Sequence, residues 1–504
     1  MDIRIDRTGP VPVYRQITAH LRTMIRSGLL PPGAKLPPER KLADTLAVNR
    51  TTVLNAYQEL KSEGLVRSVM GSGTVVQERN RWIAAPDLKP SIASPSYPAG
   101  GRQPTGSIVE ELLALPSDPD HISLAVGKPP ADCIPLQWIK QIQAELIETC
   151  GDALFQHCPT EGDRSLRESI GGWMQKRGVS GCSGAEVMVV SGAQQGLDLV
   201  ARTFIEPGDV VLVEQPTYFT AVQLFQLYGA KLIAIPSDGE GQLPLDVLES
   251  MLLKYRPKLI YVQPTFQNPT GRVWTQEQRQ RFMELAERGH TMIVEEDPYF
   301  ELRYEGETVP PLKAFDRAGL VIYVGTFSKL LYPGMRIGWV CAPPEAMTAM
   351  IRWKQVMDLH SNHLAQTVTN ELIRSGKLEM HLTKCKEVYA AKRDWMMQAI
   401  ETYAKEELCC SIPQGGYYLW VQLPETVSST VLLMHALDEN VSFVPGSHFS
   451  MNDPMATSSY IRLNFTRPSH DQIEQGIRLL GQAVRRLRHR RPRGDSFRQS
   501  LPLV

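Results

Sequence analysis

The chain has 504 residues, of which 42% are apolar and 21% charged, and its formal net charge is zero. This composition excludes an intrinsically disordered chain, and the length predicts two or three folded domains rather than one. No apolar run reaches the about 18 residues that a bilayer-spanning helix needs, so we do not expect a membrane protein.

The cysteines and the amino terminus indicate a cellular compartment. The eight cysteines form no C-x-x-C pair and have no histidines at matching spacing, so we expect free thiols and no metal site. The amino terminus lacks the basic and apolar regions of a secretory signal. Both features predict a cytoplasmic protein.

Positive charge is concentrated at the two ends of the chain. Residues 1–79 carry twelve Lys and Arg against seven Asp and Glu, and the stretch 485–498 holds seven arginines and one aspartate. A basic amino-terminal part on a neutral protein predicts a polyanionic partner for that part.

The first eighty residues predict a winged helix-turn-helix. Periodicity and breaking residues predict helices over about 11–27, 39–46 and 50–63, and a hairpin of strands 65–69 and 74–76. The third helix presents Arg50, Thr51 and Thr52 at its amino end, where a recognition helix meets bases and phosphates. Gly71 and Gly73 in the wing would let the backbone approach DNA closely.

These residues resemble the GntR-type winged helix. The matching motifs run from Pro12-Val-Tyr-Arg-Gln-Ile through Leu29-Leu-Pro-Pro-Gly, Asn49-Arg-Thr-Thr-Val and Glu63-Gly-Leu-Val to Gly71-Ser-Gly-Thr. The resemblance places Arg40, Arg50, Thr52 and Gly73 on the family's DNA-contacting positions. Pro38 departs from the family, which usually has a serine that caps the second helix. We assign residues 1–78 to this DNA-binding domain and 79–118, rich in Pro, Ser, Ala and Gly, to a flexible linker.

Beyond the linker, strands alternate with helices, which predicts an α/β fold around a mostly parallel sheet. Polar segments follow apolar strands at five places: after residues 187–190, 210–214, 259–262, 291–294 and 320–325. The carboxyl ends of the strands in such sheets bind ligands.

The chemistry of these segments matches one cofactor, pyridoxal 5′-phosphate. The cofactor needs an amine for its aldehyde, a carboxylate for its ring nitrogen, phosphate donors and groups around its ring. Lys329 supplies the amine and Asp297 the carboxylate. The remaining candidates are Ser328, Arg336 and the helix start at Gly192, Ala193 and Gln194 for the phosphate, Asn268 and Tyr299 for the phenolic oxygen, and Tyr218 for the ring face.

This part of the chain also resembles the fold-type I aminotransferases, most closely the 2-aminoadipate aminotransferase group. The matching motifs include Ser191-Gly-Ala-Gln-Gln, Asn268-Pro-Thr-Gly, Asp297-Pro-Tyr, Ser328-Lys and Ile461-Arg-Leu-Asn-Phe. The resemblance implies an aminotransferase-like domain over 119–485 with a smaller α+β subdomain over about 380–485. It also implies that Arg462 binds an amino acid's carboxylate. His157 stands where the family commonly has a tyrosine that reaches the phosphate of the neighbouring subunit's cofactor.

The combination resembles the MocR-type subfamily of GntR transcriptional regulators. That resemblance implies a homodimer that binds double-stranded operator DNA near its own or a neighbouring gene and senses the cofactor or an amino-acid-like effector. The alternative is a working aminotransferase of the 2-aminoadipate, aromatic or branched amino acid type with an appended DNA-binding domain. We expect residues 486–504 to be a basic, disordered tail.

Overall fold

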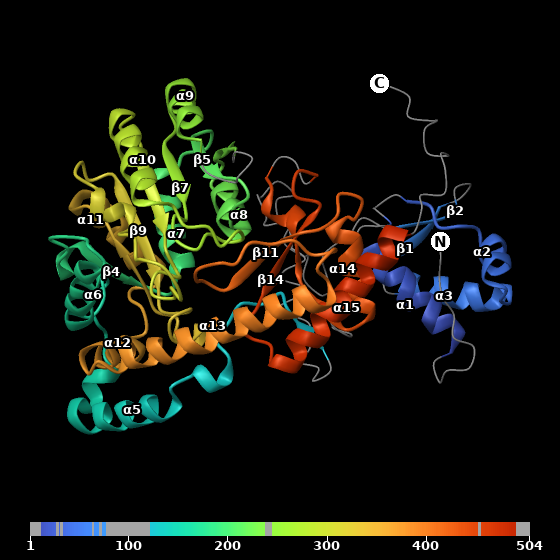
Figure 1. Ribbon diagram of the computed structural model, residues 1–504, viewed down its shortest axis with the longest axis horizontal. Coiled ribbons are helices and arrows are strands. Elements are labelled where there is room, and N and C mark those ends of the chain that lie inside the picture. Colours follow the sequence, from blue (N-terminus) through green and yellow to red (C-terminus); the bar gives the residue numbers. More distant parts are fainter. Residues whose placement is uncertain are drawn as a thin grey trace, which may run out of the picture. The chain divides into compact units, whose positions relative to one another are not determined.

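The computed structural model describes residues 12–26, 30, 34–62, 65–69, 73–76, 121–236, 244–451 and 455–489. The chain divides into two compact units, Met1–Ala99 and Gly100–Val504 (Figure 1). Each unit is described by itself. The predicted linker and Gly71 lie outside the described residues.

The first unit is a winged helix-turn-helix, as predicted. Its elements are α1 (Val13–Arg26), α2 (Glu39–Leu46), α3 (Arg50–Ser62), β1 (Val66–Val69) and β2 (Gly73–Val76). The two strands pair antiparallel. The apolar stripes of α1 and α3 form the core, where Ile17, Leu21, Val53 and Leu60 are fully buried. Pro38 precedes α2 and makes no side-chain cap, because proline has no side-chain acceptor for the first helical N–H groups.

A seven-stranded sheet organises the second unit. In the order β4-β10-β9-β8-β7-β5-β6, only β10 runs antiparallel to its neighbours. The strands are β4 (Val187–Val190), β5 (Val210–Glu214), β6 (Lys231–Ile235), β7 (Leu259–Val262), β8 (Met292–Glu296), β9 (Val321–Thr326) and β10 (Gly338–Cys341). The mostly parallel sheet is therefore confirmed, and β6 and β10 are strands that the sequence analysis did not identify.

Helices cover both faces of this sheet, which is why its strands are continuous apolar runs (Figure 1). Val211 and Val213 belong to a core with α7 (Ala193–Phe204), α8 (Phe219–Leu227) and α11 (Pro344–Met357). Leu212, on the opposite face of the same strand, packs with α9 (Leu245–Tyr255) and α10 (Gln276–Arg288).

The carboxyl-terminal part is a smaller α+β arrangement. Its three-stranded sheet has the order β11-β14-β13, and its strand β12 pairs with β3 from the start of the unit. The strands are β3 (Ile122–Ser123), β11 (Tyr418–Gln422), β12 (Val441–Ser442), β13 (Val444–Pro445) and β14 (Tyr460–Asn464). The smaller subdomain thus includes residues near 122 as well as the predicted range of about 380–485.

The other helices of the unit are α5 (Leu136–Cys150), α6 (Arg164–Lys176), α12 (His363–Arg374), α13 (Lys377–Tyr403), α14 (Ser429–Asp438) and α15 (His470–His489). Short 3-10 helices span Ala131–Cys133, Gly151–Phe155, Gly184–Glu186, Leu312–Phe315, Pro333–Met335 and Gly446–Phe449. Because α15 continues to His489, residues 486–489 are helical, which corrects the predicted start of the tail; residues 490–504 lie outside the described part.

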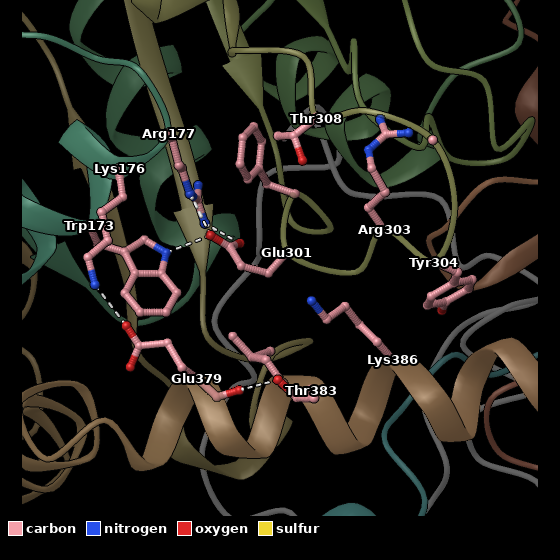
Figure 2. A pocket seen from close by; sticks show the side chains of 13 residues that line it. Trp173, Lys176, Arg177, Glu301, Arg303, Tyr304, Thr308, Glu379, Thr383 and Lys386 are labelled. Atoms are coloured by element: carbon pink, nitrogen blue, oxygen red, sulfur yellow. Dashed lines mark hydrogen bonds and ion pairs between the residues drawn. The ribbon is translucent and has the colours of Figure 1, made fainter.

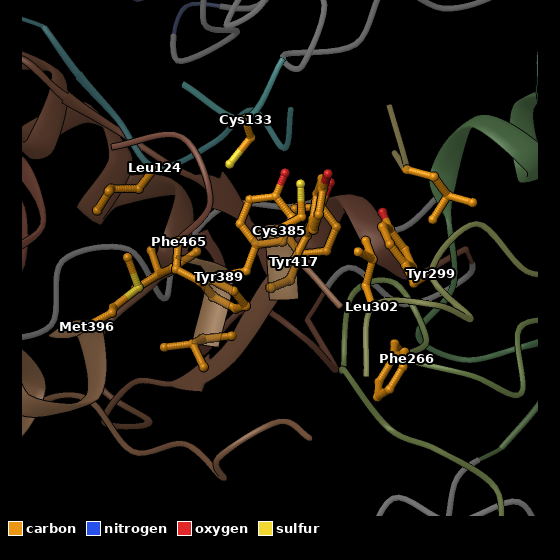
Figure 3. Close-up of a cluster of buried hydrophobic side chains, with 14 of the residues drawn as sticks. Leu124, Cys133, Phe266, Tyr299, Leu302, Cys385, Tyr389, Met396, Tyr417 and Phe465 are labelled. Atoms are coloured by element: carbon orange, nitrogen blue, oxygen red, sulfur yellow. The ribbon is translucent and has the colours of Figure 1, made fainter. Parts of the chain in front are cut away.

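One apolar core connects the two parts of this unit. Tyr417 and Phe465 of the smaller part lie in the same buried cluster as Phe266, Tyr299 and residues of α13 (Figure 3). The site at the sheet edge is therefore bordered by the smaller part. No helix in the described ranges is both long enough and apolar enough to cross a bilayer.

Candidate functional site

The predicted residues converge at one edge of the large sheet. Strands β4, β5, β7, β8 and β9 run in the same direction, so their carboxyl ends lie together. The segments after them carry Gly192, Tyr218, Asn268, Asp297 and Lys329. Five segments that are far apart in the sequence therefore supply one site, as expected for an open α/β sheet.

Lys329 lies at the junction between the sheet and the smaller part. Its Nζ donates a hydrogen bond to the carbonyl oxygen of Gly127, 2.8 Å away, and lies 5.7 Å from the centre of the Tyr417 ring. The Tyr417 hydroxyl donates to the Lys329 carbonyl at 2.7 Å, which fixes the backbone. The amine thus has a single weakly held partner that an aldehyde-bearing ligand can replace.

Asp297 is a buried carboxylate without a hydrogen-bonded partner. It is 1% exposed, and neither of its oxygens makes a hydrogen bond of normal geometry within the described part of the chain. Burial raises the pKa of this carboxyl to about 6, while Arg177, Arg279 and the nearby Tyr323 hydroxyl lower it. A buried carboxylate is costly unless a cation or donor meets it, so this position fits a ligand with a protonated nitrogen.

A cradle for an anion lies at the start of α7. Gly192 has φ of +91°, and a Cβ added there would lie 2.6 Å from Nη2 of Arg336. That same nitrogen donates to the Ser191 carbonyl at 2.6 Å. The first N–H groups of α7, at Ala193 and Gln194, have no acceptor within the helix. An arginine beside a helix amino terminus fits a phosphate group.

Ser328 lies on the neighbouring strand end and is 9% exposed. Its hydroxyl accepts a hydrogen bond from Thr326 Oγ1 at 3.1 Å, and its N–H donates to the same atom at 3.1 Å. The hydroxyl proton of Ser328 therefore remains available for an anion.

Arg462 is buried where the smaller part meets the sheet. Its Nη1 donates to Asn268 Oδ1 at 2.9 Å and its Nη2 to the Ala125 carbonyl at 3.0 Å. Its guanidinium lies 4.1 Å from the centre of the Tyr418 ring. Its Nε is buried without a partner in the described residues. A guanidinium with an unused donor fits a carboxylate ligand.

The two predicted ring contacts differ in burial. Tyr299 is 2% exposed and packs 5.3 Å from the Tyr417 ring, whereas Tyr218 is half-buried and lies 5.4 Å from the Phe219 ring. Burial, with the nearby carboxylate of Glu296, raises the pKa of Tyr218 to about 12. Tyr218 is thus a neutral ring at physiological pH.

Sequence reasoning missed several supporting residues. Gln263 accepts from the Asn268 N–H at 3.0 Å and donates to Glu296 at 2.7 Å, which orients Asn268. At Gly127 a Cβ would lie 2.4 Å from the Tyr418 hydroxyl oxygen, so only glycine fits beside Lys329. Gln263 directly follows a predicted strand and was detectable there, whereas no local pattern indicates Gly127.

His157 pairs with another histidine. Its Nδ1 lies 3.1 Å from Nε2 of His360, whose own Nδ1 lies 2.9 Å from the Ser361 carbonyl. A carbonyl only accepts, so His360 Nδ1 is the donor to it. In the neutral pair, His157 Nδ1 then donates to His360 Nε2. The predicted contact of His157 with a neighbouring subunit remains a prediction.

The predicted DNA-binding residues lie at the amino ends of α2 and α3. Arg40 and Thr51 are exposed, Thr52 is half-buried, and Gly73 has φ of +86°. Arg50 is bound to Glu39, with Nε and Nη2 at 3.1 and 3.0 Å from Oε2. Its guanidinium is 57% exposed, so a base or phosphate can replace this carboxylate.

Comparison with known proteins separates the same two units. Residues 13–76 match the model for bacterial regulatory proteins of the gntR family, and residues 119–480 match the model for aminotransferase class I and II. The chain is 38% identical to aromatic-amino-acid aminotransferase 1 of Thermococcus litoralis, over 75% of this chain and 91% of the relative.

Two regulators match both units. The HTH-type transcriptional regulator YdfD of Bacillus subtilis is 32% identical over 95% of this chain and 98% of its own. The probable rhizopine catabolism regulatory protein MocR of Rhizobium meliloti is 30% identical over 89% of this chain and 90% of its own. The structure of alpha-aminoadipate aminotransferase LysN from Thermus thermophilus, complexed with N-(5'-phosphopyridoxyl)-L-leucine, has a TM-score of 0.70 and 34% identity, and covers 76% of this chain and 96% of its own.

Proposed function

Because the chain belongs to the aminotransferase class I and II family and carries a gntR-family domain, as MocR-like regulators do, we propose that it is a pyridoxal phosphate-dependent transcriptional regulator. One observation carries this conclusion: the same chain holds a winged helix with an exposed reading surface and a full set of side chains for the cofactor.

The residues of the sheet edge fit pyridoxal 5′-phosphate. The uncompensated carboxylate of Asp297 would hold the ring nitrogen in its protonated form. Arg336, Ser328 and the start of α7 would hold the phosphate. When bound, the cofactor supplies an aldehyde for the Lys329 amine and an electron-withdrawing ring.

The remaining residues would surround the ring and a second ligand. Tyr218 would cover the ring face, and Asn268 and Tyr299 would bind the phenolic oxygen. Arg462 would bind the carboxylate of an amino-acid-like effector, exchanging its hydrogen bond to Asn268 for one to the ligand. That exchange breaks a contact between the smaller part and the sheet, which gives the effector a structural consequence.

The regulation would follow from linkage. An effector changes DNA affinity only to the extent that it binds two conformers of the protein differently. We propose that the protein acts in the cytoplasm as a homodimer on two operator half-sites near its own or a neighbouring gene, with Arg40, Arg50, Thr51 and Thr52 at the DNA. Gly73 and Gly71 would bring the wing backbone close to the DNA.

Fluorescence anisotropy with DNA from upstream of the gene tests this function. Cofactor-free protein, cofactor-loaded protein and Lys329→Ala are titrated in parallel at fixed salt. We expect tight, salt-sensitive binding whose Kd depends on the cofactor, and a Lys329→Ala protein that no longer responds to it. Absence of specific binding in all three would contradict a regulator.

A second candidate function is transamination by the same site. The completeness of the sheet-edge site favours it, since every predicted catalytic and cofactor-binding side chain lies there. Repeated conversion of an amino donor and a keto acid, at about 1 per second or faster, would establish an enzyme. A single half-turnover would indicate a sensor.

A further inference from the structure

A second pocket lies in the aminotransferase-like unit between α6 and α13, with a volume of about 600 Å³ (Figure 2). Its lining residues come from α6, from the segment 300–308 and from α13. None of them belongs to the site that contains Lys329. The volume lies in the range of pockets that bind small organic molecules.

The lining of this pocket is positively charged. It contains four basic side chains, Lys176, Arg177, Arg303 and Lys386, and two acidic ones, Glu301 and Glu379, which leaves two positive charges uncompensated. Two of the four are neutralised within the pocket: Lys176 binds Glu379 at 2.8 Å, and Arg177 binds Glu301 with Nε at 2.8 Å.

Lys386 is the uncompensated charge best placed for a ligand. It reaches from α13 into the pocket (Figure 2), and it makes no hydrogen bond or ion pair within the described part of the chain. Arg303, on the opposite wall, donates to Gln414 at 2.9 Å from Nη1 alone. The rest of its guanidinium remains available.

The pocket also offers an apolar wall. Phe300 lies under the Arg177 guanidinium, 4.7 Å from its carbon, and Trp173 uses its indole N–H on Glu301 at 2.6 Å. Because the polar atom of Trp173 is already satisfied, its ring faces the pocket as an apolar surface. The Thr383 hydroxyl donates to the Glu379 carbonyl at 3.0 Å and so can only accept from a ligand.

We propose that this pocket is a second ligand site, for a small organic anion whose charged group meets Lys386 and Arg303 and whose apolar body lies against Trp173 and Phe300. The proposal does not depend on DNA binding or on the function proposed above. The pocket adjoins the cofactor site, because Arg177 also donates to the Tyr323 hydroxyl next to Asp297.

Isothermal titration of the cofactor-loaded full chain with benzoate and with phenyl phosphate tests the site. We expect saturable binding of at least one probe, weakened about tenfold or more in Lys386→Ala and largely retained in Lys386→Arg. Lys384→Ala is the matched control, because Lys384 lies on the same helix with its amine on the Asp132 carbonyl, outside the pocket.

Arg462→Ala distinguishes the two sites. A probe that binds the second pocket keeps its affinity in Arg462→Ala, whereas a probe at the amino-acid site loses it. Loss in Arg462→Ala with no change in Lys386→Ala would overturn the proposal. Equal binding to all variants, or no binding of either probe at about 10 mM, would also overturn it.

Discussion

Arg462 of strand β14 donates a hydrogen bond of 2.9 Å to the side chain of Asn268, which follows strand β7 of the large sheet. The bond joins the smaller part of the unit to the sheet edge. The second hydrogen bond of Arg462, to Ala125, holds the segment that precedes Gly127, the acceptor of Lys329. A ligand that takes over Arg462 therefore affects both neighbours of the cofactor.

Replacing Arg462 with alanine should remove amino-acid binding and preserve cofactor binding. A lost charge-assisted contact of about 1.5–3 kcal/mol corresponds to a Kd about 10–100-fold higher for the amino acid. Titration of aromatic, branched and acidic amino acids, followed by cofactor absorbance, measures this. Arg462→Lys keeps the charge without the two-pronged geometry, so its Kd should lie between the two. Unchanged affinities in Arg462→Ala would show that the carboxylate binds elsewhere.

Replacing Gly192 with alanine should weaken cofactor binding. The new Cβ would lie 2.6 Å from Arg336 Nη2, which displaces the guanidinium from the start of α7. Loss of an arginine–phosphate contact predicts a cofactor Kd at least about tenfold higher, measured by equilibrium dialysis.

Gly208→Ala provides the matched control for Gly192. Gly208 has φ of +103°, so alanine is strained there too, but its Cβ would meet no atom within 4 Å. Both variants should lose stability through backbone strain, and only Gly192→Ala should lose cofactor affinity. Equal affinities would contradict the assigned phosphate cradle.

The sequence predicted those parts of the site that follow from local pattern. Asp297 and Lys329 directly follow apolar strands, and parallel strands bring such positions to one edge. The contacts that complete the site could not be predicted this way. The acceptor of Lys329 is Gly127, 202 residues away, and Arg177 pairs with Glu301 across 124 residues.

The boundaries of the elements show the same limitation. Val187–Val190 and Glu39–Leu46 match the predicted ranges because clear breaking residues flank them. The arginine-rich stretch after residue 485 was predicted as a tail from its charge. It continues α15 to His489, where Arg486 pairs with Glu439 at 2.9 Å. That long-range pairing has no signature in the local sequence.

Replacing Arg50 with alanine should abolish specific DNA binding while cofactor absorbance stays unchanged. Arg50 is the exposed guanidinium at the amino end of α3, and a bidentate contact to a guanine contributes about 1–3 kcal/mol of discrimination. Anisotropy with operator and scrambled DNA measures the preference. Lys61→Ala removes one charge from the other end of the same helix and should weaken both DNAs equally. Similar losses of preference in the two variants would show that α3 does not read bases.

Replacing Asp297 with asparagine should stabilise the cofactor-free protein at neutral pH. Burial raises the carboxyl pKa to about 6 from an ordinary 3.8, so the folded state binds this proton more tightly than the unfolded state. The free energy of unfolding therefore falls as pH rises through that window, by up to about 3 kcal/mol at pH 7. Asparagine carries no charge to bury.

Urea unfolding of both proteins between pH 4.5 and 8 checks this prediction about Asp297. The advantage of Asp297→Asn should be largest above pH 6 and should shrink towards pH 4.5, because the wild-type carboxyl is then increasingly protonated. Added pyridoxal phosphate should reverse the order at pH 7.5, since only the wild-type carboxylate pairs with a protonated ring nitrogen. An asparagine variant less stable than the cofactor-free wild type at pH 8 would mean that another cation already neutralises Asp297 in the empty site.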